Sequence, residues 1–172
     1  LPDVPKRLKN ILNQINFLEI EKNAKVALDW SSEANNHIIF ESDAHYPKLL
    51  HEISDPPPLI YVKGNLDILN YPQIAIVGAR NMSRYGQKNA GAFAKALAQR
   101  NIVITSGLAR GIDTTAHQSA VNTISRSGNC VAVMGTGLNY IYPSQNKKLA
   151  EQILSKNGAL ISELPLETNV NK

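Results

Sequence analysis

The sequence predicts an α/β protein in which helices cover both faces of a mostly parallel sheet. From residue 73 onward, short and fully apolar runs alternate with amphipathic stretches. Apolar strands separated by helices are typical of βαβ units, whose parallel sheet is buried on both sides. The chain has 172 residues, 43% of them hydrophobic, which is enough for one main domain and a small appendage. The pattern therefore indicates an open α/β core preceded by a short N-terminal helical segment.

The first part of the chain is expected to hold short elements. They are, in order, a helix over residues 6–28 interrupted around 21–23, a strand over 35–40, a short helix over 48–53 and a strand over 59–63. The first helix follows from apolar positions at helical spacing. Three prolines at 56–58 stop the second helix, because proline lacks the amide donor that a helix needs.

From residue 73 onward, the sequence pattern predicts four strands and three helices in strict alternation. Strands are expected over 73–77, 101–105, 130–134 and 159–162, and helices over 84–100, 112–121 and 144–156. Right-handed crossovers bring the strand-to-helix loops to the carboxyl edge of such a sheet, where ligands of open α/β folds bind. The candidates for function are therefore the first loop (78–85), the second loop (106–113) and the third loop (135–148).

The first loop contains a glycine followed closely by two arginines. Gly78 allows a tight turn, and Arg80 and Arg84 offer planar, permanently charged groups that suit phosphate. Ser83 either caps the following helix or donates to a phosphate. The arrangement is not the dinucleotide fingerprint G-x-G-x-x-G, which argues against an ordinary NAD site.

The second loop also combines glycine with arginine at the end of a strand. Ser106 and Gly107 end a strand, and Arg110 and Gly111 precede a helix whose first amides are suited to hold a phosphate. Asp113 is expected to cap that helix rather than bind a metal, since no second acidic residue accompanies it. His117, four residues on, lies on the same helix face, and we expect it to make an orienting hydrogen bond rather than act as a general base.

The third loop combines aromatic and basic residues. Tyr140 and Tyr142 precede Lys147 and Lys148, which open the last helix. Stacking aromatics beside positive charge suit single-stranded nucleic acid, although a tyrosine before a proline also fills a sheet edge without any ligand. Lysines in the first turn oppose the helix dipole, so at least one of them is a candidate for a partner's phosphate.

Composition narrows the class of protein further. Lysine and arginine exceed aspartate and glutamate by 18 to 14, an excess that permits nucleic-acid binding only where charges cluster. The single cysteine, Cys130, excludes an intramolecular disulfide and lies in an apolar run typical of the core. No membrane span, signal peptide, metal site or cofactor site is recognised, so we expect a cytoplasmic protein.

Four stretches together resemble the DNA-processing protein A family (DprA, also called Smf). They are VGARNMSRYG, SGLARGIDTTAH, GLNYIYPSQNKKL followed by GALISELP, and the upstream HYPKLL and DPPPLIYVKGNL. The resemblance covers roughly residues 37–165. It implies an extended Rossmann-like fold and a non-enzymatic single-stranded DNA-binding protein that protects incoming DNA and helps to load RecA during natural transformation, usually as a homodimer.

The resemblance also implies which residues bind DNA at the carboxyl edge. By motif these are Gly78, Arg80, Ser83, Ser106, Gly107, Arg110, Gly111 and Lys148. Residues 1–34 are then expected to be the tail of an N-terminal helical domain, and 35–172 the extended Rossmann-like DNA-binding domain. Family members continue into a segment close to F-P-x-R-N-R-I-I after the SELP-like strand, so we expect the chain to be truncated at its C-terminus.

Two other classes of function are compatible with parts of the pattern. A Rossmann-like phosphoribohydrolase acting on nucleoside phosphates also has glycine-rich edge loops, but its P-G-G-x-G-T motif and following glutamate are not matched by residues 133–138. A purely protein-binding scaffold leaves Arg80 and Arg110 without a purpose. The sequence thus favours DNA binding.

Overall fold

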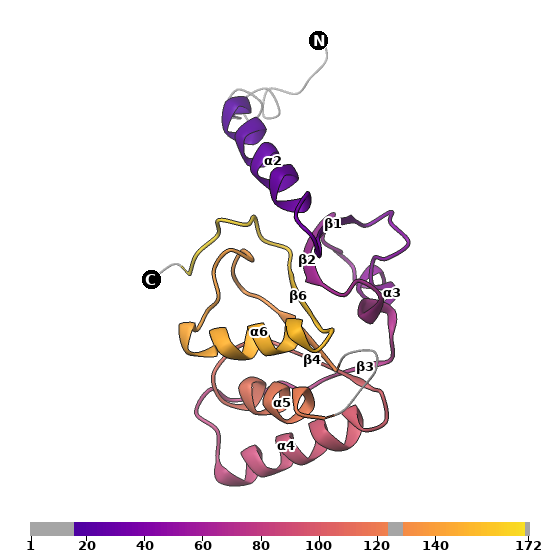
Figure 1. Cartoon of the computed structure of the whole chain (residues 1–172), viewed down its shortest axis with the longest axis vertical. Helices are drawn as coiled ribbons and strands as arrows, with labels where there is room; N and C mark the ends of the chain where they lie inside the picture. The colour runs from indigo at the N-terminus through magenta and orange to yellow at the C-terminus, as the bar shows by residue number, and fades with distance from the viewer. Residues whose placement is uncertain (1–15, 124–128, 171–172) are drawn as a thin grey trace.

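The protein folds around one six-stranded sheet, seen in a computed structural model that describes residues 16–123 and 129–170 (Figure 1). The strands are β1 (Asn36–Phe40), β2 (Leu59–Gly64), β3 (Gln73–Ala75), β4 (Val103–Ser106), β5 (Cys130–Val133) and β6 (Ala159–Ser162). The helices are α2 (Phe17–Ser31), α3 (Lys48–His51), η1 (Asp67–Asn70), α4 (Arg84–Ala98), α5 (Ile112–Val121), η2 (Ser144–Asn146) and α6 (Lys147–Ser155).

The sheet is mixed, with a parallel part and an antiparallel extension. Its strand order is β1-β2-β6-β5-β4-β3. Strands β3 to β6 pair in parallel, whereas β1 and β2 add to β6 as an antiparallel pair. The predicted mostly parallel Rossmann-like sheet is confirmed, and the strand pair before residue 65 extends it.

The long helices all pack on one face of the sheet. Strand residues Ile104, Ala132 and Leu160 alternate toward this face and share one core cluster with α2, α4, α5 and α6. Figure 1 shows α4, α5 and α6 side by side. The contact of α4 with α5 uses alanines that are fully buried, namely Ala94, Ala98, Ala116 and Ala120. Such small side chains let the backbones of the two helices approach each other closely.

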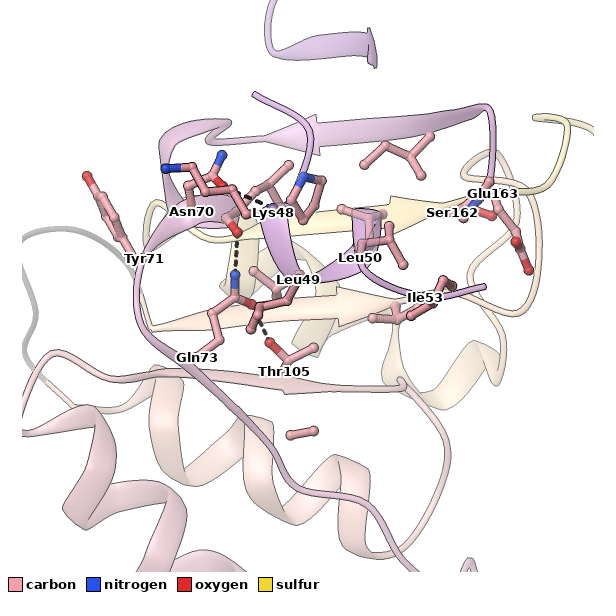
Figure 2. Close-up of a pocket in the computed structure, with 18 of the residues that line it drawn as sticks. Lys48, Leu49, Leu50, Ile53, Asn70, Tyr71, Gln73, Thr105, Ser162 and Glu163 are labelled. Carbon is pink, nitrogen blue, oxygen red and sulfur yellow. Dashed lines mark hydrogen bonds between the residues drawn. The ribbon is translucent and has the colours of Figure 1, made fainter. Parts of the chain in front are cut away.

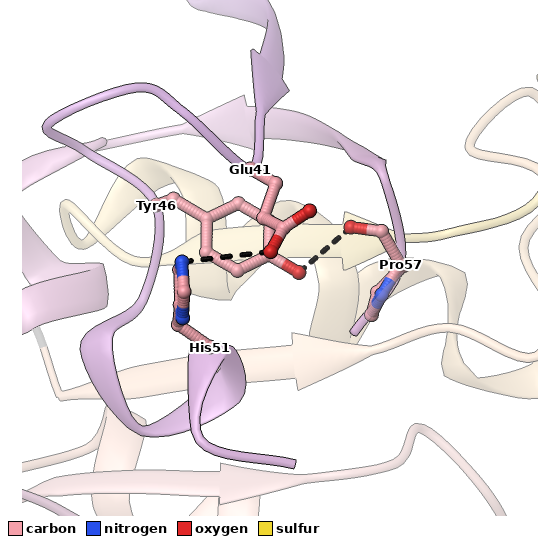
Figure 3. Close-up of polar contacts among 4 residues, drawn as sticks. All are labelled: Glu41, Tyr46, His51 and Pro57. Atoms are coloured by element: carbon pink, nitrogen blue, oxygen red, sulfur yellow. Dashed lines mark hydrogen bonds and ion pairs between the residues drawn. The ribbon is translucent and has the colours of Figure 1, made fainter. Parts of the chain in front are cut away.

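The opposite face is covered only in part by the described residues. Val103, Val131 and Ala159 point to this side, where α3 and η1 complete a second cluster. The loop around α3 is held by the Tyr46 hydroxyl, which donates to the Pro57 carbonyl at 2.8 Å, and by an ion pair of His51 with Glu41 at 3.5 Å (Figure 3). Helices lie on both faces as predicted, but the long ones gather on one side.

An open apolar groove of about 850 Å³ lies beside α3 on that second face (Figure 2). It is lined by Leu49 of α3, by Ile53 just after that helix and by the strand residue Val133. Gln73 also lines it, and its side-chain oxygen accepts a hydrogen bond from the Thr105 hydroxyl. The groove lies against the face of the sheet, and its lining includes no residue of the three loops. It is thus separate from the loops at the carboxyl edge.

The predicted bounds of α3, β3, α4 and β4 differ from the observed ones by up to two residues, and η1 was not predicted. The larger differences lie at the first and last predicted helices. The predicted interruption at 21–23 is wrong, because α2 runs unbroken from its cap at Asn16 to Ser31 with only Ala27 and Trp30 buried. A mostly exposed helix tolerates several polar residues in a row, so the polar residues 21–23 do not interrupt α2. The predicted helix over 144–156 begins as the 3₁₀ turn η2. Residues 6–15 of the first predicted helix lie outside the described residues.

Candidate nucleic-acid interface

The three predicted loops meet at the carboxyl edge of the sheet. The first loop follows β3, the second follows β4 and the third follows β5, and these strands run in parallel. Parallel strands end at a common edge, so the crossover connections place the three loops beside one another. The structure therefore brings the predicted site residues together in one region.

The first and second loops touch through their backbones at Gly111. Its φ is +86°, and a Cβ there would lie 2.2 Å from the Ala79 carbonyl oxygen and 2.6 Å from that of Arg80. The Ile112 amide donates to the same Ala79 carbonyl at 3.3 Å. Only glycine fits this conformation and this space. The turn that contains Arg80 therefore packs directly against Gly111, the neighbour of Arg110 in the chain.

Gly78 and Gly107 are also needed for close packing. A Cβ on Gly78 would lie 2.7 Å from Cγ1 of Ile112, and one on Gly107 would lie 2.6 Å from a carboxylate oxygen of Asp113. Each glycine therefore makes room for a side chain of α5's first turn. The two glycines therefore serve the packing of the loops against α5.

Two polar side chains of the second loop are buried and hold the loops together. The Ser106 hydroxyl is 3% exposed and donates to the Ile76 carbonyl at 2.5 Å, which leaves it no free hydrogen for a phosphate. Burial raises the pKa of Asp113, while hydrogen bonds from the backbone of Ala109 and Gly78 act in the opposite direction. The expected capping role of Asp113 is wrong, because the N-cap of α5 is Gly111.

Ser83 caps α4, as one of its two predicted roles requires. Its Oγ accepts a hydrogen bond from the Gly86 amide at 3.0 Å. This satisfies one of the amides that have no partner inside the helix. Arg84 follows in the first turn of the helix and is exposed.

The third loop is fastened to the second by Asn146. The side-chain nitrogen of Asn146 donates to the Leu108 carbonyl at 2.7 Å and to the Thr114 hydroxyl oxygen at 2.8 Å. Lys147 and Lys148 follow at once as the first residues of α6, and both are exposed. Sequence reasoning missed Asn146, whose only signal was its place between a proline turn and a helix.

A fourth segment, the stretch after β6, also reaches this edge. The Gly137 amide donates to the Thr168 carbonyl at 2.8 Å, and a Cβ on Gly137 would lie 2.1 Å from the Pro165 carbonyl oxygen. The segment supplies Glu167, which accepts a hydrogen bond from the Tyr140 hydroxyl at 3.0 Å. This hydrogen bond and the nearby carboxylate raise the pKa of Tyr140. Gly137 was the available sequence signal, since glycine marks close backbone approach.

The aromatic side chains of the edge differ in how free they are. Tyr140 is 37% exposed and bound to Glu167, whereas Tyr142 is 51% exposed and makes no hydrogen bond among the described residues. Tyr85, in the first turn of α4, is 76% exposed. Two open tyrosine rings therefore accompany the charged loops.

The cationic side chains of the edge form no ion pair among the described residues. Arg80, Arg110 and Lys148 are all exposed. Within residues 16–123 and 129–170 the one ion pair joins His51 of α3 to Glu41. Cations that have no carboxylate partner are available to an anionic ligand. The combination of free charge and open rings suits a phosphate-bearing chain with unstacked bases.

The two reactive side chains nearby are buried. His117 is fully buried, and its Nε2 donates to the Ser106 carbonyl at 3.3 Å, which confirms the expected orienting hydrogen bond. Burial lowers the pKa of His117 to about 4 and raises that of the Cys130 thiol to about 12. Among the described residues, no three metal-binding side chains cluster and no helix is long and apolar enough to span a membrane.

A sequence model described as DNA recombination-mediator protein A matches residues 37–172. The chain belongs to this family. It is 40% identical over 146 residues to Protein Smf of Escherichia coli (strain K12), and the match covers 85% of this chain and 38% of that protein. It is 45% identical over 111 residues to DNA processing protein DprA of Streptococcus pneumoniae, covering 64% of this chain and 38% of the relative.

Solved structures of the DprA type share the fold. The X-ray structure of DNA processing protein A from Streptococcus pneumoniae has a TM-score of 0.74 and 34% identity, over 92% of this chain and 51% of that one. A structure describing the single-stranded DNA binding mode of the protein from Helicobacter pylori has a TM-score of 0.67 and 28% identity, over 80% of this chain and 59% of that one. This DprA-family chain thus spans about half the length of its relatives or less.

Proposed function

We propose that this member of the DprA family binds single-stranded DNA along the carboxyl edge of its sheet. The observation that carries the proposal is the backbone contact at Gly111, which fixes Arg80 beside Arg110 while both arginines stay exposed and unpaired among the described residues. Neighbouring guanidinium groups suit consecutive phosphates of one strand. The named binding mode of the Helicobacter pylori relative supports the choice of ligand.

The other predicted residues divide into two roles. Lys148 extends the positive row from α6 and is proposed to contact a further phosphate. Gly78, Gly107 and Gly111 shape the loops through close packing, so their proposed share in binding is to hold the charged turns in place. Ser83 and Ser106 hold the loops in place through their side chains, so their proposed share in binding is indirect.

The proposal is tested with a fluorescently labelled single-stranded oligonucleotide and the complete natural protein. Arg80→Ala and Arg110→Ala are each expected to weaken binding about tenfold, the usual size of one hydrogen-bonded charge contact. The control is Arg100→Ala. Arg100 is exposed too, but it lies past the other end of α4, where it donates to the Ala96 carbonyl at 3.0 Å. Equal affinities of all three variants and the wild type would remove the arginines from the site.

We further propose that the complete protein acts in DNA recombination in the cytoplasm, forms a homodimer and loads RecA onto incoming DNA during natural transformation. Family membership supports these roles, and the DNA site supplies the strand on which a recombinase assembles. Co-sedimentation of RecA with strand-bound protein tests the loading step. RecA that assembles at the same rate with and without the protein would contradict it.

We propose finally that the site is not enzymatic. A nucleoside-phosphate phosphoribohydrolase needs a general acid or base at the edge, whereas His117 and Cys130 are buried and Asp113 is 8% exposed. The exposed carboxylate of Glu167 is engaged by hydrogen bonds from Asn139 and Tyr140. Incubation with nucleoside monophosphates is expected to release no free base. Turnover above the protein-free rate would favour the enzyme instead.

A further inference from the structure

The side chain of Asn146 joins two parts of the proposed DNA site. Asn146 is 8% exposed and directly precedes α6. Its Nδ2 donates one hydrogen bond to the Leu108 carbonyl and a second to the Thr114 hydroxyl oxygen, at 2.7 and 2.8 Å. Both N–H groups of the amide are therefore used on the second loop and on the start of α5.

The acceptors of these bonds are themselves fixed. The Thr114 hydroxyl donates to the Ala109 carbonyl at 2.6 Å, so Asn146, Thr114 and Ala109 form a chain of hydrogen bonds. Leu108 is 3% exposed and belongs to the core. A chain of bonds in a buried place has few alternative partners, so it sets a single arrangement of the two loops.

The chemistry of the position is specific to asparagine. Two acceptors converge on one nitrogen, and only an amide offers two N–H donors there in this shape. Aspartate has the same outline but presents oxygen to the Leu108 carbonyl, which repels it. Alanine and serine leave at least one buried acceptor without its donor.

We infer that Asn146 is a positioning residue for DNA binding: it sets Lys148 relative to Arg110, so that both charges contact the same strand. Arg110 lies two residues after Leu108, and Lys148 lies two residues after Asn146. The bridge between Asn146 and Leu108 therefore links the two charged positions by a short path. The inference rests on the proposed function, because it concerns the same site.

The test compares four proteins by single-strand affinity: the wild type, Asn146→Ala, Lys148→Ala and the double variant, each as the complete natural protein. Lys148→Ala is expected to weaken binding about tenfold in the wild-type background. In the Asn146→Ala background the same change is expected to weaken it about threefold or less, because coupled residues are not additive. A residue that only stabilises the fold leaves the Lys148→Ala effect unchanged.

Asn129 provides a matched control. It is equally buried, at 5% exposed, and its Nδ2 also donates to two acceptors, the Ala120 and Thr123 carbonyls at 3.0 and 2.7 Å. It lies at the opposite end of α5, away from the carboxyl edge. Asn129→Ala is expected to lower the melting temperature about as much as Asn146→Ala, with unchanged affinity and an unchanged Lys148→Ala effect.

The outcomes separate the inference from the function beneath it. A full tenfold Lys148→Ala effect in the Asn146→Ala background overturns the positioning role, and so does an equal loss of binding in Asn129→Ala. Wild-type protein without single-strand affinity overturns the proposed function itself. Should Asn146→Ala not fold, Thr114→Val removes one of the two acceptors and is measured in the same cycle, with the same expected loss of the Lys148→Ala effect.

Discussion

Replacement of Gly111 by alanine is expected to force the first and second loops apart. The residue has φ +86° and ψ −127°, a conformation that costs a residue with a side chain about 1–3 kcal/mol. The new Cβ would also lie 2.2 Å from the Ala79 carbonyl oxygen, inside the backbone of the other loop. Overpacking of this kind typically costs a further 1–3 kcal/mol. The sum is about 4 kcal/mol of unfolding free energy, a large share of the stability of a typical domain.

Urea unfolding followed by circular dichroism measures this loss. The control is Gly135→Ala, because Gly135 lies in the third loop with open space where its Cβ would stand and without a positive φ. Gly135→Ala is expected to change the unfolding free energy by less than about 0.5 kcal/mol. The same midpoint for Gly111→Ala, Gly135→Ala and the wild type would refute the contact between the loops. Folded Gly111→Ala protein is also expected to bind single strands more weakly, because Arg80 leaves its place beside Arg110.

Three further predictions concern stability and access. Burial lowers the pKa of His117 from its ordinary 6.5 to about 4 in the folded state. The free energy of unfolding is therefore expected to be unaffected by this histidine above pH 6.5, and to fall by about 3 kcal/mol as the pH drops to 4. His117→Leu should remove that part of the fall; parallel profiles for the variant and the wild type would contradict it. Ser83→Ala should cost about 1 kcal/mol in urea, through loss of the cap bond to Gly86, and no loss would rule that bond out. The Cys130 thiol, 1% exposed and with its pKa raised to about 12, should react with a thiol reagent only after unfolding, and fast labelling of the folded protein would contradict its burial.

The alternating part of the fold could be predicted from the sequence because each of its signals is local. The apolar strand at 159–162 and the helix at 112–121 begin and end where predicted, since Gly158 and Gly111 mark their starts. The parallel pairing then follows because each crossover helix returns the chain to the same end of the sheet before the next strand begins. The unequal cover of the two sheet faces could not be predicted, because periodicity does not say on which face a helix packs.

The site was only partly predictable for a related reason. Glycine and arginine in the first two loops showed which segments would be functional, but not that Gly111 packs on the Arg80 turn. That contact joins residues about 30 positions apart, and no local pattern records it. Ser106 and Asp113 have the chemistry of ligand-binding residues, yet the fold uses both to hold the loops. Hydroxyl and carboxylate groups serve either purpose, and only the surroundings decide between them.

The most direct test of the account is the salt dependence of single-strand binding by the double variant Arg80→Ala/Arg110→Ala. Each phosphate contact adds about 0.7 to the slope of log affinity against log salt concentration for a single strand. Loss of two contacts is therefore expected to lower the slope by about 1.4, with the Arg100→Ala slope unchanged. A double variant that keeps the full wild-type slope while remaining folded would contradict the claim that the paired arginine turns bind the DNA backbone.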